Sequence, residues 1–310
     1  MKKQKLLVAL VAAGLSSTSF AAADVSAKLE INTDAVSAAD TTFDQNGHVE
    51  FGVSSGKTMG DNYVKAKGAI RLTLDGDTSV RDVYLQAGSD AWDAKLGRFE
   101  TTKLFPLGKD IMVKNAGSSV YKADKARGRI GDGGGQIALT FNTSDTVSIE
   151  LGTIVGDAAT GGTQESLVSG IRPVVTFKGD GFKVLAGYES LTYDVTGGGE
   201  IDKSGFGLAT NFDLGSANIN LAYASLDDSD SNRETTSYTA NATMGDFGVG
   251  VLYSDDDNAG TSTDVTTVYA AYSMPLMDIE GATLSFGGSH STATGAEDTT
   301  ALRMRLNYAF

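Results

Sequence analysis

The chain has 310 residues, no Cys and a formal net charge of −14. The absence of Cys excludes disulfide scaffolds, thiol catalysis and Cys-ligated zinc. The acidic balance argues against nucleic-acid binding, which needs a basic surface. Only His48 and His290 are present for metal binding or acid–base chemistry near neutral pH. We therefore expect no metal, no cofactor and no enzymatic activity.

The first 23 residues have the layout of a secretory signal peptide. Three Lys precede an apolar run over residues 6–15, and small residues follow, with Ala21 and Ala23 at the A-x-A spacing of a cleavage site. A membrane anchor would need about 20 apolar residues. We expect export and cleavage near this site. Residues 24–310, with 22 bases, 39 acids and a net charge of −17, then form a single domain.

From Asp24 onward the dominant pattern is strict alternation of apolar with polar or small residues. Ile219, Leu221 and Tyr223, for example, alternate with Asn and Ala. Successive side chains of a strand point to opposite faces, so each such segment has one apolar and one polar face. The pattern predicts an all-β chain.

The breaks between these segments are of two kinds. Tight turns built on Gly, Asp and Ser are expected at residues 89–90, 145, 179–181, 215–216 and 245–246. Longer polar stretches are expected as loops at residues 34–46, 156–169, 227–233, 255–263 and 291–298. Short and long breaks alternate along the chain, which is typical of an outer-membrane barrel with short turns at one end and long loops at the other.

Counting the segments predicts a transmembrane antiparallel β-barrel of sixteen strands, with fourteen as the alternative. The predicted strands cover residues 24–33, 47–56, 62–74, 79–88, 91–99, 135–142, 146–155, 170–178, 182–194, 203–213, 217–226, 235–244, 246–254, 264–274, 282–290 and 299–310. An even number places both termini at the same end of the barrel, which we expect to be the periplasmic end.

Charges on the polar rows indicate which face lines a lumen. These rows carry both signs, as in Lys28 beside Glu30, and Arg303 beside Arg305. A sixteen-stranded barrel is too wide for side chains to fill and leaves an aqueous channel. We therefore expect the apolar rows to face lipid and the charged rows to face water.

The last strand carries a further signal, because its apolar row ends on the terminal Phe310. In this pattern the sequence resembles the Gram-negative outer-membrane porins, whose final strand is read by the barrel-insertion machinery. The resemblance implies an outer-membrane location, contact with membrane lipid and lipopolysaccharide, and a homotrimer.

The connection over residues 100–134 is far longer than the others. Structureless loops beyond about 15 residues are uncommon and are usually functional. This one contains apolar residues, among them Leu104, Phe105 and Leu107, which we expect to be buried against the inside of the barrel wall. Its position matches the third outer loop of the porins, which folds into the lumen and narrows it, and residues 104–110 look like that family's Pro/Gly-containing segment.

This loop has seven bases and four acids, and Lys or Arg at a constriction favours anions. We expect a preference for anions or polar sugar-like solutes. The alternative is that these bases pair with lumen acids or lie on exposed parts of the loop. The predicted pore-lining residues are Lys65, Lys67, Arg71, Arg98, Lys103, Lys109, Asp110, Lys114, Lys122, Lys125, Arg127 and Arg129.

Arg98 is included through the resemblance, because Gly97-Arg98 is similar to a Gly-Arg step of the porins whose Arg faces the constriction. The alternation instead gives Arg98 the parity of Trp92 and Leu96, which are expected to face lipid. A bulge or kink at Gly97 would be needed to turn Arg98 inward.

The predicted function is passive diffusion of small hydrophilic solutes and ions through a water-filled channel. The alternative is a non-channel outer-membrane barrel, either an enzyme or an adhesive or structural protein. An enzyme needs a His beside Asp or Ser, and both His residues fall near outer strand ends. An adhesive or structural barrel needs a lumen plugged by the long loop. A phosphate loop at residues 131–135 lacks the Lys-Ser/Thr pair.

Overall fold

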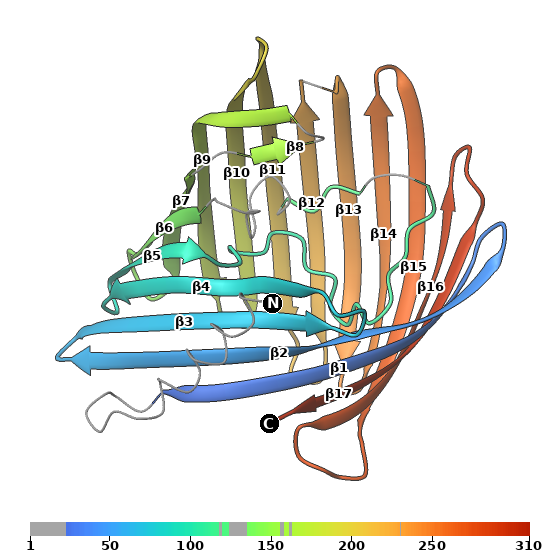
Figure 1. Ribbon diagram of the computed structural model, residues 1–310, viewed down its shortest axis with the longest axis horizontal. Helices are drawn as coiled ribbons and strands as arrows, with labels where there is room; N and C mark the ends of the chain where they lie inside the picture. Colours follow the sequence, from blue (N-terminus) through green and yellow to red (C-terminus); the bar gives the residue numbers. More distant parts are fainter. Residues whose placement is uncertain (1–22, 118–119, 124–134, 156–157, 161–162, 230) are drawn as a thin grey trace.

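The computed structural model describes residues 23–117, 120–123, 135–155, 158–160, 163–229 and 231–310 (Figure 1). In this part of the chain every regular element is a β-strand. No helix there is long and apolar enough to cross a membrane.

The strands follow one another along the chain as alternating antiparallel partners. They are β1 (Asp24–Ser37), β2 (Thr41–Met59), β3 (Asn62–Thr73), β4 (Thr78–Gly88), β5 (Trp92–Arg98), β6 (Gly135–Asn142), β7 (Val147–Val155), β8 (Ala158–Thr160), β9 (Thr163–Gly179), β10 (Phe182–Val195), β11 (Glu200–Asp213), β12 (Asn218–Asp228), β13 (Arg233–Met244), β14 (Phe247–Asn258), β15 (Thr261–Pro275), β16 (Ala282–Ala293) and β17 (Thr299–Ala309).

The sheet closes on itself with sixteen strand positions. β7 and the short β8 both pair with β9, so together they fill one position. β1 pairs with both β2 and β17, which joins the first and last strands. The backbone of Phe310 completes this seam, since Ala27 N donates to Phe310 O (2.8 Å) and Phe310 N donates to Ala27 O (2.9 Å). The sixteen-stranded antiparallel barrel is thus confirmed, and the alternative of fourteen strands is wrong.

The two faces of the sheet are divided as the alternation predicts. In β14, Phe247, Val249 and Val251 are 58%, 48% and 40% exposed on the outer face, while Leu252 and Ser254 on the inner face are fully buried. Large apolar side chains therefore cover the outside of the barrel, where a membrane protein meets lipid.

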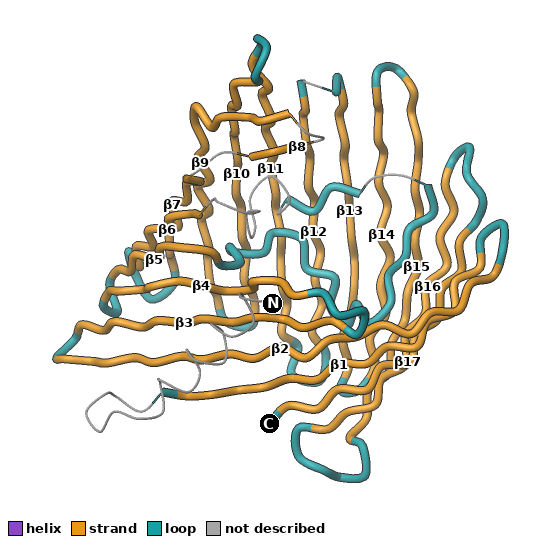
Figure 2. Tube along the Cα trace, in the orientation of Figure 1, coloured by secondary structure: helices purple, strands orange, loops and turns teal. Residues whose placement is uncertain are grey.

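Two of the expected long loops are mostly strand. β1 runs to Ser37 and β2 starts at Thr41, so most of residues 34–46 are paired; likewise only residues 259–260 separate β14 from β15. The polar composition of these stretches was misleading, because backbone hydrogen bonds extend a hairpin whether or not its side chains are apolar. The strands therefore continue as tall hairpins at this end of the barrel (Figures 1 and 2).

The connection between β5 and β6 turns into the barrel, and we call residues 99–134 the inward loop. In Figures 1 and 2 its described part, residues 99–117 and 120–123, crosses the inside of the barrel along the inner face of the strands from β9 to β17. This confirms the predicted fold of the long connection into the lumen.

Candidate pore lining and inward loop

The inward loop runs along the inner wall in one direction and then turns back, so it has an outgoing and a returning limb. On the outgoing limb, residues 99–111, hydrogen bonds reach successive strands: Asn241 of β13 donates to Pro106 O (2.8 Å) and Tyr269 of β15 donates to Leu107 O (2.9 Å). At the far end, Arg303 and Arg305 of β17 both donate to Ile111 O, at 3.3 and 3.4 Å.

On the returning limb, residues 112–123, backbone N–H groups of the loop donate to side-chain hydroxyls of the wall. Lys114 N donates to Ser289 Oγ (3.0 Å) and Ala116 N donates to Ser291 Oγ (2.8 Å), both on β16. Tyr121 N then donates to Ser237 Oγ of β13 (3.2 Å). The limb is therefore aligned by a row of wall hydroxyls.

The apolar side chains of the loop are buried against this wall, as expected from the sequence. Leu104, Phe105 and Leu107 are 1%, 0% and 2% exposed and share a cluster with wall residues such as Leu252. Burying a side chain of this size contributes about 1.5–3 kcal/mol.

Wall glycines make room for this contact. A Cβ at Gly207 would lie 2.8 Å from the Cβ atoms of Leu104 and Ala123, and one at Gly187 would lie 2.5 Å from Leu104 Cδ1. A larger residue at either position would force the loop or its side chains to shift, so glycine at these two positions permits the close approach of the loop. We call the inner faces of β9–β16, on which the loop rests, the covered wall.

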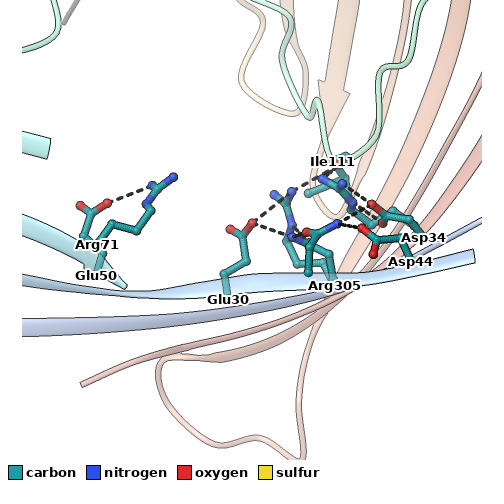
Figure 3. Close-up of polar contacts among 10 residues, drawn as sticks. Glu30, Asp34, Asp44, Glu50, Arg71, Ile111 and Arg305 are labelled. Carbon is teal, nitrogen blue, oxygen red and sulfur yellow. Dashed lines mark hydrogen bonds and ion pairs between the residues drawn. The ribbon is translucent and has the colours of Figure 1, made fainter. Parts of the chain in front are cut away.

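The inner faces of β2, β3 and β4 carry charged residues instead, and we call them the open wall. Glu50 Oε2 lies 2.9 Å from Arg71 Nη2 and 3.4 Å from Arg81 Nε (Figure 3 shows the Arg71 pair). Lys67 Nζ lies 2.8 Å from Asp82 Oδ2. Two guanidinium groups thus share the Glu50 carboxylate on the lumen side, and Arg81 Nη2 also lies 3.8 Å from Oε1 of the exposed Glu100.

Arg81 reaches this position through a β-bulge that sequence reasoning missed. Gly68 pairs with Val83 and Ile70 pairs with Val80, so Arg81 and Asp82 together lie opposite one residue of β3. Val80 and Val83 are 48% and 50% exposed on the outer face. Strict alternation would have separated the two charged residues, whereas two Val flanking two charges is the pattern that indicates such a bulge.

A second charged group lies where the barrel closes. Arg303 forms a two-point ion pair with Asp34, with Nε and Nη2 at 2.7 and 2.5 Å from the two carboxylate oxygens. Arg305 lies 3.3 Å from Glu30 and donates to Asn32 Oδ1 (2.7 Å). Figure 3 shows these groups along the same wall as the Arg71 pair. The alternation predicts that both Arg lie on a polar row, but the predicted pore-lining set does not contain them. Their acidic partners, Asp34 and Glu30, lie at the opposite end of the chain.

A cavity of about 390 Å³ lies between the inward loop and the wall formed by β1, β2 and β17. It is bounded by acids and bases in equal number. The charged lining residues are Asp34, Asp44, Asp110, Lys114, Lys122 and Arg303. Its mixed lining suits a hydrated polar solute better than an apolar ligand.

The predicted site residues fall into three groups. Lys67 and Arg71 lie on the open wall and are ion-paired, and Lys65 lies over the ring of Tyr63, 4.7 Å from its centroid. Four predicted residues lie on the described part of the inward loop, at the cavity or beside it: Lys109, Asp110, Lys114 and Lys122. Lys103 is exposed near the start of the loop. Lys125, Arg127 and Arg129 lie outside the described residues.

The expectation that Arg98 faces the constriction is not met. Arg98 pairs with Val83, so both side chains lie on the outer face, and its Nε donates to Val80 O (3.1 Å). Gly97 does have a positive φ of 124°, but this kink leaves the register unchanged. Parity, rather than the resemblance to the Gly-Arg step, gives the correct face.

The two His residues lie on opposite faces of the sheet. His48 of β2 is paired with Glu30 in the inner row, whereas His290 of β16 is paired with Thr300, whose Oγ1 is 2.9 Å from His290 Nδ1 on the outer face. They therefore cannot act in one site. Within the described residues, no group of three or more His, Asp or Glu is arranged to hold a metal ion.

The profile of one protein family, described as Gram-negative porin, matches residues 7–310. The chain therefore belongs to the Gram-negative porins, channel-forming β-barrels of the outer membrane, and the resemblance seen in its sequence is confirmed. Comparison with curated proteins gave no match.

Solved structures of the same architecture share the barrel at low sequence identity. The anion-selective porin from Comamonas acidovorans aligns with a TM-score of 0.68 and 13% identity, covering 93% of this chain and 99% of that one. OmpF of Salmonella typhi in complex with daunomycin gives 0.68 and 14%, covering 93% and 97%. OmpT of Vibrio cholerae gives 0.66 and 14%, covering 95% and 99%. At these identities the likeness shows the fold.

Proposed function

We propose that this porin carries small hydrophilic solutes by passive diffusion, without a catalytic step, and that it prefers anions. The observation that carries the preference is the arrangement on the open wall, where Arg71 and Arg81 both contact the carboxylate of Glu50 and the further acid beside Arg81, Glu100 at 3.8 Å, is largely exposed. Fixed charges beside a low-dielectric wall raise the local concentration of counter-ions, and Arg or Lys side chains lining a pore favour anions.

The inward loop supports this proposal from the other side of the lumen. Lys109 and Lys114 form no ion pair with any described residue, and Lys114 lines the cavity together with three acids and two further bases. The alternative interpretation, that the bases pair with lumen acids, applies to Lys67 and Arg71. The preference is therefore expected to be moderate, because Lys67, Arg71 and Arg81 of the open wall each lie beside an acid.

One structural neighbour is described as an anion-selective porin, which is consistent with a barrel of this shape passing anions. The experiment is a planar bilayer holding purified protein between two concentrations of KCl. Stepwise conductance with a reversal potential of the sign set by chloride supports the proposal. A complete lack of current would contradict the channel, and the sign set by potassium would contradict the preference.

We also propose a homotrimer that packs through the outer faces of the first and last strands. A hollow of about 600 Å³ lies there over β1, β2 and β14–β17, where Ala270 and Gly288 leave space between Phe247, Phe286 and Leu302. Ala270→Trp should fill the hollow and weaken the trimer in cross-linking and native electrophoresis. Leu208→Trp, on the outer face of β11, is the control. A monomeric wild-type protein would contradict this proposal.

Two proposals concern the ends of the chain. Residues 1–23 are proposed to be removed on export, which mass spectrometry of the mature protein should show as an N-terminus near Asp24. Phe310, which is 65% exposed, is proposed to be recognised by the barrel-insertion machinery. Deleting it should then reduce the amount of barrel in the outer membrane, whereas refolding in detergent should be much less affected.

A further inference from the structure

Arg172 of β9 is the largest fully buried side chain in the described part of the barrel, with 0% exposure. It lies on the inner face of the covered wall, beneath the inward loop. A buried guanidinium is tolerated only where its charge is paired and its donors are used. Its partners therefore show which parts of the molecule depend on it.

The guanidinium group contacts the two neighbouring strands, β7 and β10, and both limbs of the loop. Its Nη1 lies 3.7 Å from Glu150 Oε1 of β7, and its Nε lies 3.4 Å from Glu189 Oε2 of β10. Its Nη2 donates to Thr102 O (2.9 Å) and to Ala123 O (3.0 Å). Thr102 starts the outgoing limb and Ala123 ends the described part of the returning limb, so one side chain joins the two limbs to each other and to the wall.

The carboxylates of Glu150 and Glu189, which face Arg172, also accept hydrogen bonds from the loop. Thr102 Oγ1 donates to Glu150 Oε2 (2.8 Å), and the Tyr121 hydroxyl donates to Glu189 Oε1. Each limb is thus held twice, once through its backbone carbonyl and once through a side chain. Arg suits this position because Nη2 of its planar fork donates to both limbs while Nη1 and Nε lie at ion-pair distance from the two carboxylates without forming hydrogen bonds to them. Lys offers a single flexible ammonium group instead.

We propose that Arg172 is a positioning residue of the channel: it fixes where the inward loop crosses the lumen and so sets the current through each open pore. This rests on the proposed function as a diffusion channel. Arg172 does not itself face the solute path, because it is completely covered. Its effect on permeation passes through the loop.

The test compares Arg172→Met with Arg233→Met in planar bilayers. Arg233 is a matched control, since it forms a two-point ion pair with Asp256 at 2.6 Å on the wall, and this pair joins β13 to β14 without involving the loop. Arg172→Met should give a larger and noisier unit current with frequent sublevels. The fraction of time in sublevels should rise by about tenfold or more, because a hydrogen bond to a charged group is worth roughly a factor of ten in an equilibrium constant.

A role of Arg172 in folding and a role in positioning the loop change different quantities: the number of channels and the current through each channel. A residue needed only for folding would reduce the number of channels while leaving each unit current unchanged, and that result would overturn the proposal. Arg172→Lys, which keeps the charge without the fork, should restore barrel yield but only part of the steady current. If wild-type protein gives no current, the proposed function fails instead.

A milder variant keeps the proposal testable if Arg172→Met does not fold. Tyr121→Phe removes only the hydroxyl that binds Glu189 and leaves the ring buried. It should raise the sublevel fraction in the same direction by a smaller factor. Quiet, wild-type currents from both Tyr121→Phe and Arg172→Lys would overturn the proposal.

Discussion

The covered wall and the open wall belong to one sheet with one alternation, yet their inner rows differ in chemistry. Under the apolar part of the loop the covered wall presents small and hydroxyl-bearing residues such as Gly207, Ala224 and Ser237, and its buried charges, Arg172 and Glu189, are paired with each other. The open wall presents Arg71 and Lys67 against carboxylates. An inner row that receives a loop must have short side chains that can accept hydrogen bonds from the loop's N–H groups, whereas a row that faces water can hold exposed charges.

The largest expected effect comes from the covered wall. Phe105→Ala should lower the free energy of unfolding by about 3–5 kcal/mol, the usual cost of emptying a fully buried Phe site, because Phe105 is 0% exposed. Urea unfolding in lipid vesicles, followed by Trp fluorescence, measures the change. Phe206→Ala on the outer face of β11, where the ring is 38% exposed, is the control. Equal losses from both variants would show that the loop contributes no core of its own.

A smaller effect is expected from the hydroxyl row. Ser289→Ala removes the acceptor of Lys114 N–H, and leaving such a donor unpaired costs about 1–3 kcal/mol. The returning limb should then be cleaved faster by trypsin in folded barrels. Ser262→Ala, whose hydroxyl donates to Asp255 at an exposed hairpin end, should leave the cleavage rate unchanged. Identical rates in the two variants would contradict the alignment of the loop by wall hydroxyls.

The smallest effect on stability is expected on the open wall. Arg71→Gln breaks a partly exposed ion pair with Glu50, and ion pairs in contact with water contribute about 0–1 kcal/mol. The unfolding midpoint should therefore stay close to that of the wild type, while the preference for anions falls. A destabilisation as large as that of Phe105→Ala would show that the charged row holds the barrel together rather than serving the channel.

The fold could be predicted from the sequence because the two-residue repeat of a strand is visible as an alternation of apolar and polar residues. Alternation gave the sixteen positions and the outward apolar rows, and it placed Arg98 correctly even where a resemblance pointed elsewhere. It could not give the ends of the tall hairpins, since a polar strand in water and a polar loop have the same composition. Residues 34–46 and 255–263 were misjudged for that reason.

The site was harder to predict because it depends on irregularity and on distant partners. Strict alternation does not predict that Arg81 and Asp82 both face the lumen, because the bulge opposite β3 interrupts the alternation. The sequence did predict that the long loop is apolar and turns inward, but not that its limbs meet at Arg172. That meeting joins residues 102, 123 and 172, which no local pattern connects.

The central claim is that inner-face arginines of the open wall attract anions into the channel, and one pair of variants tests it directly. Arg81 and Arg98 lie on adjacent strands, one on the inner face and one on the outer face. The measurement is the reversal potential in a KCl gradient for the wild type, Arg81→Gln and Arg98→Gln. The account predicts anion preference in the wild type, a shift toward cations in Arg81→Gln and no shift in Arg98→Gln. Equal shifts in the two variants, or a cation-selective wild type, would contradict it.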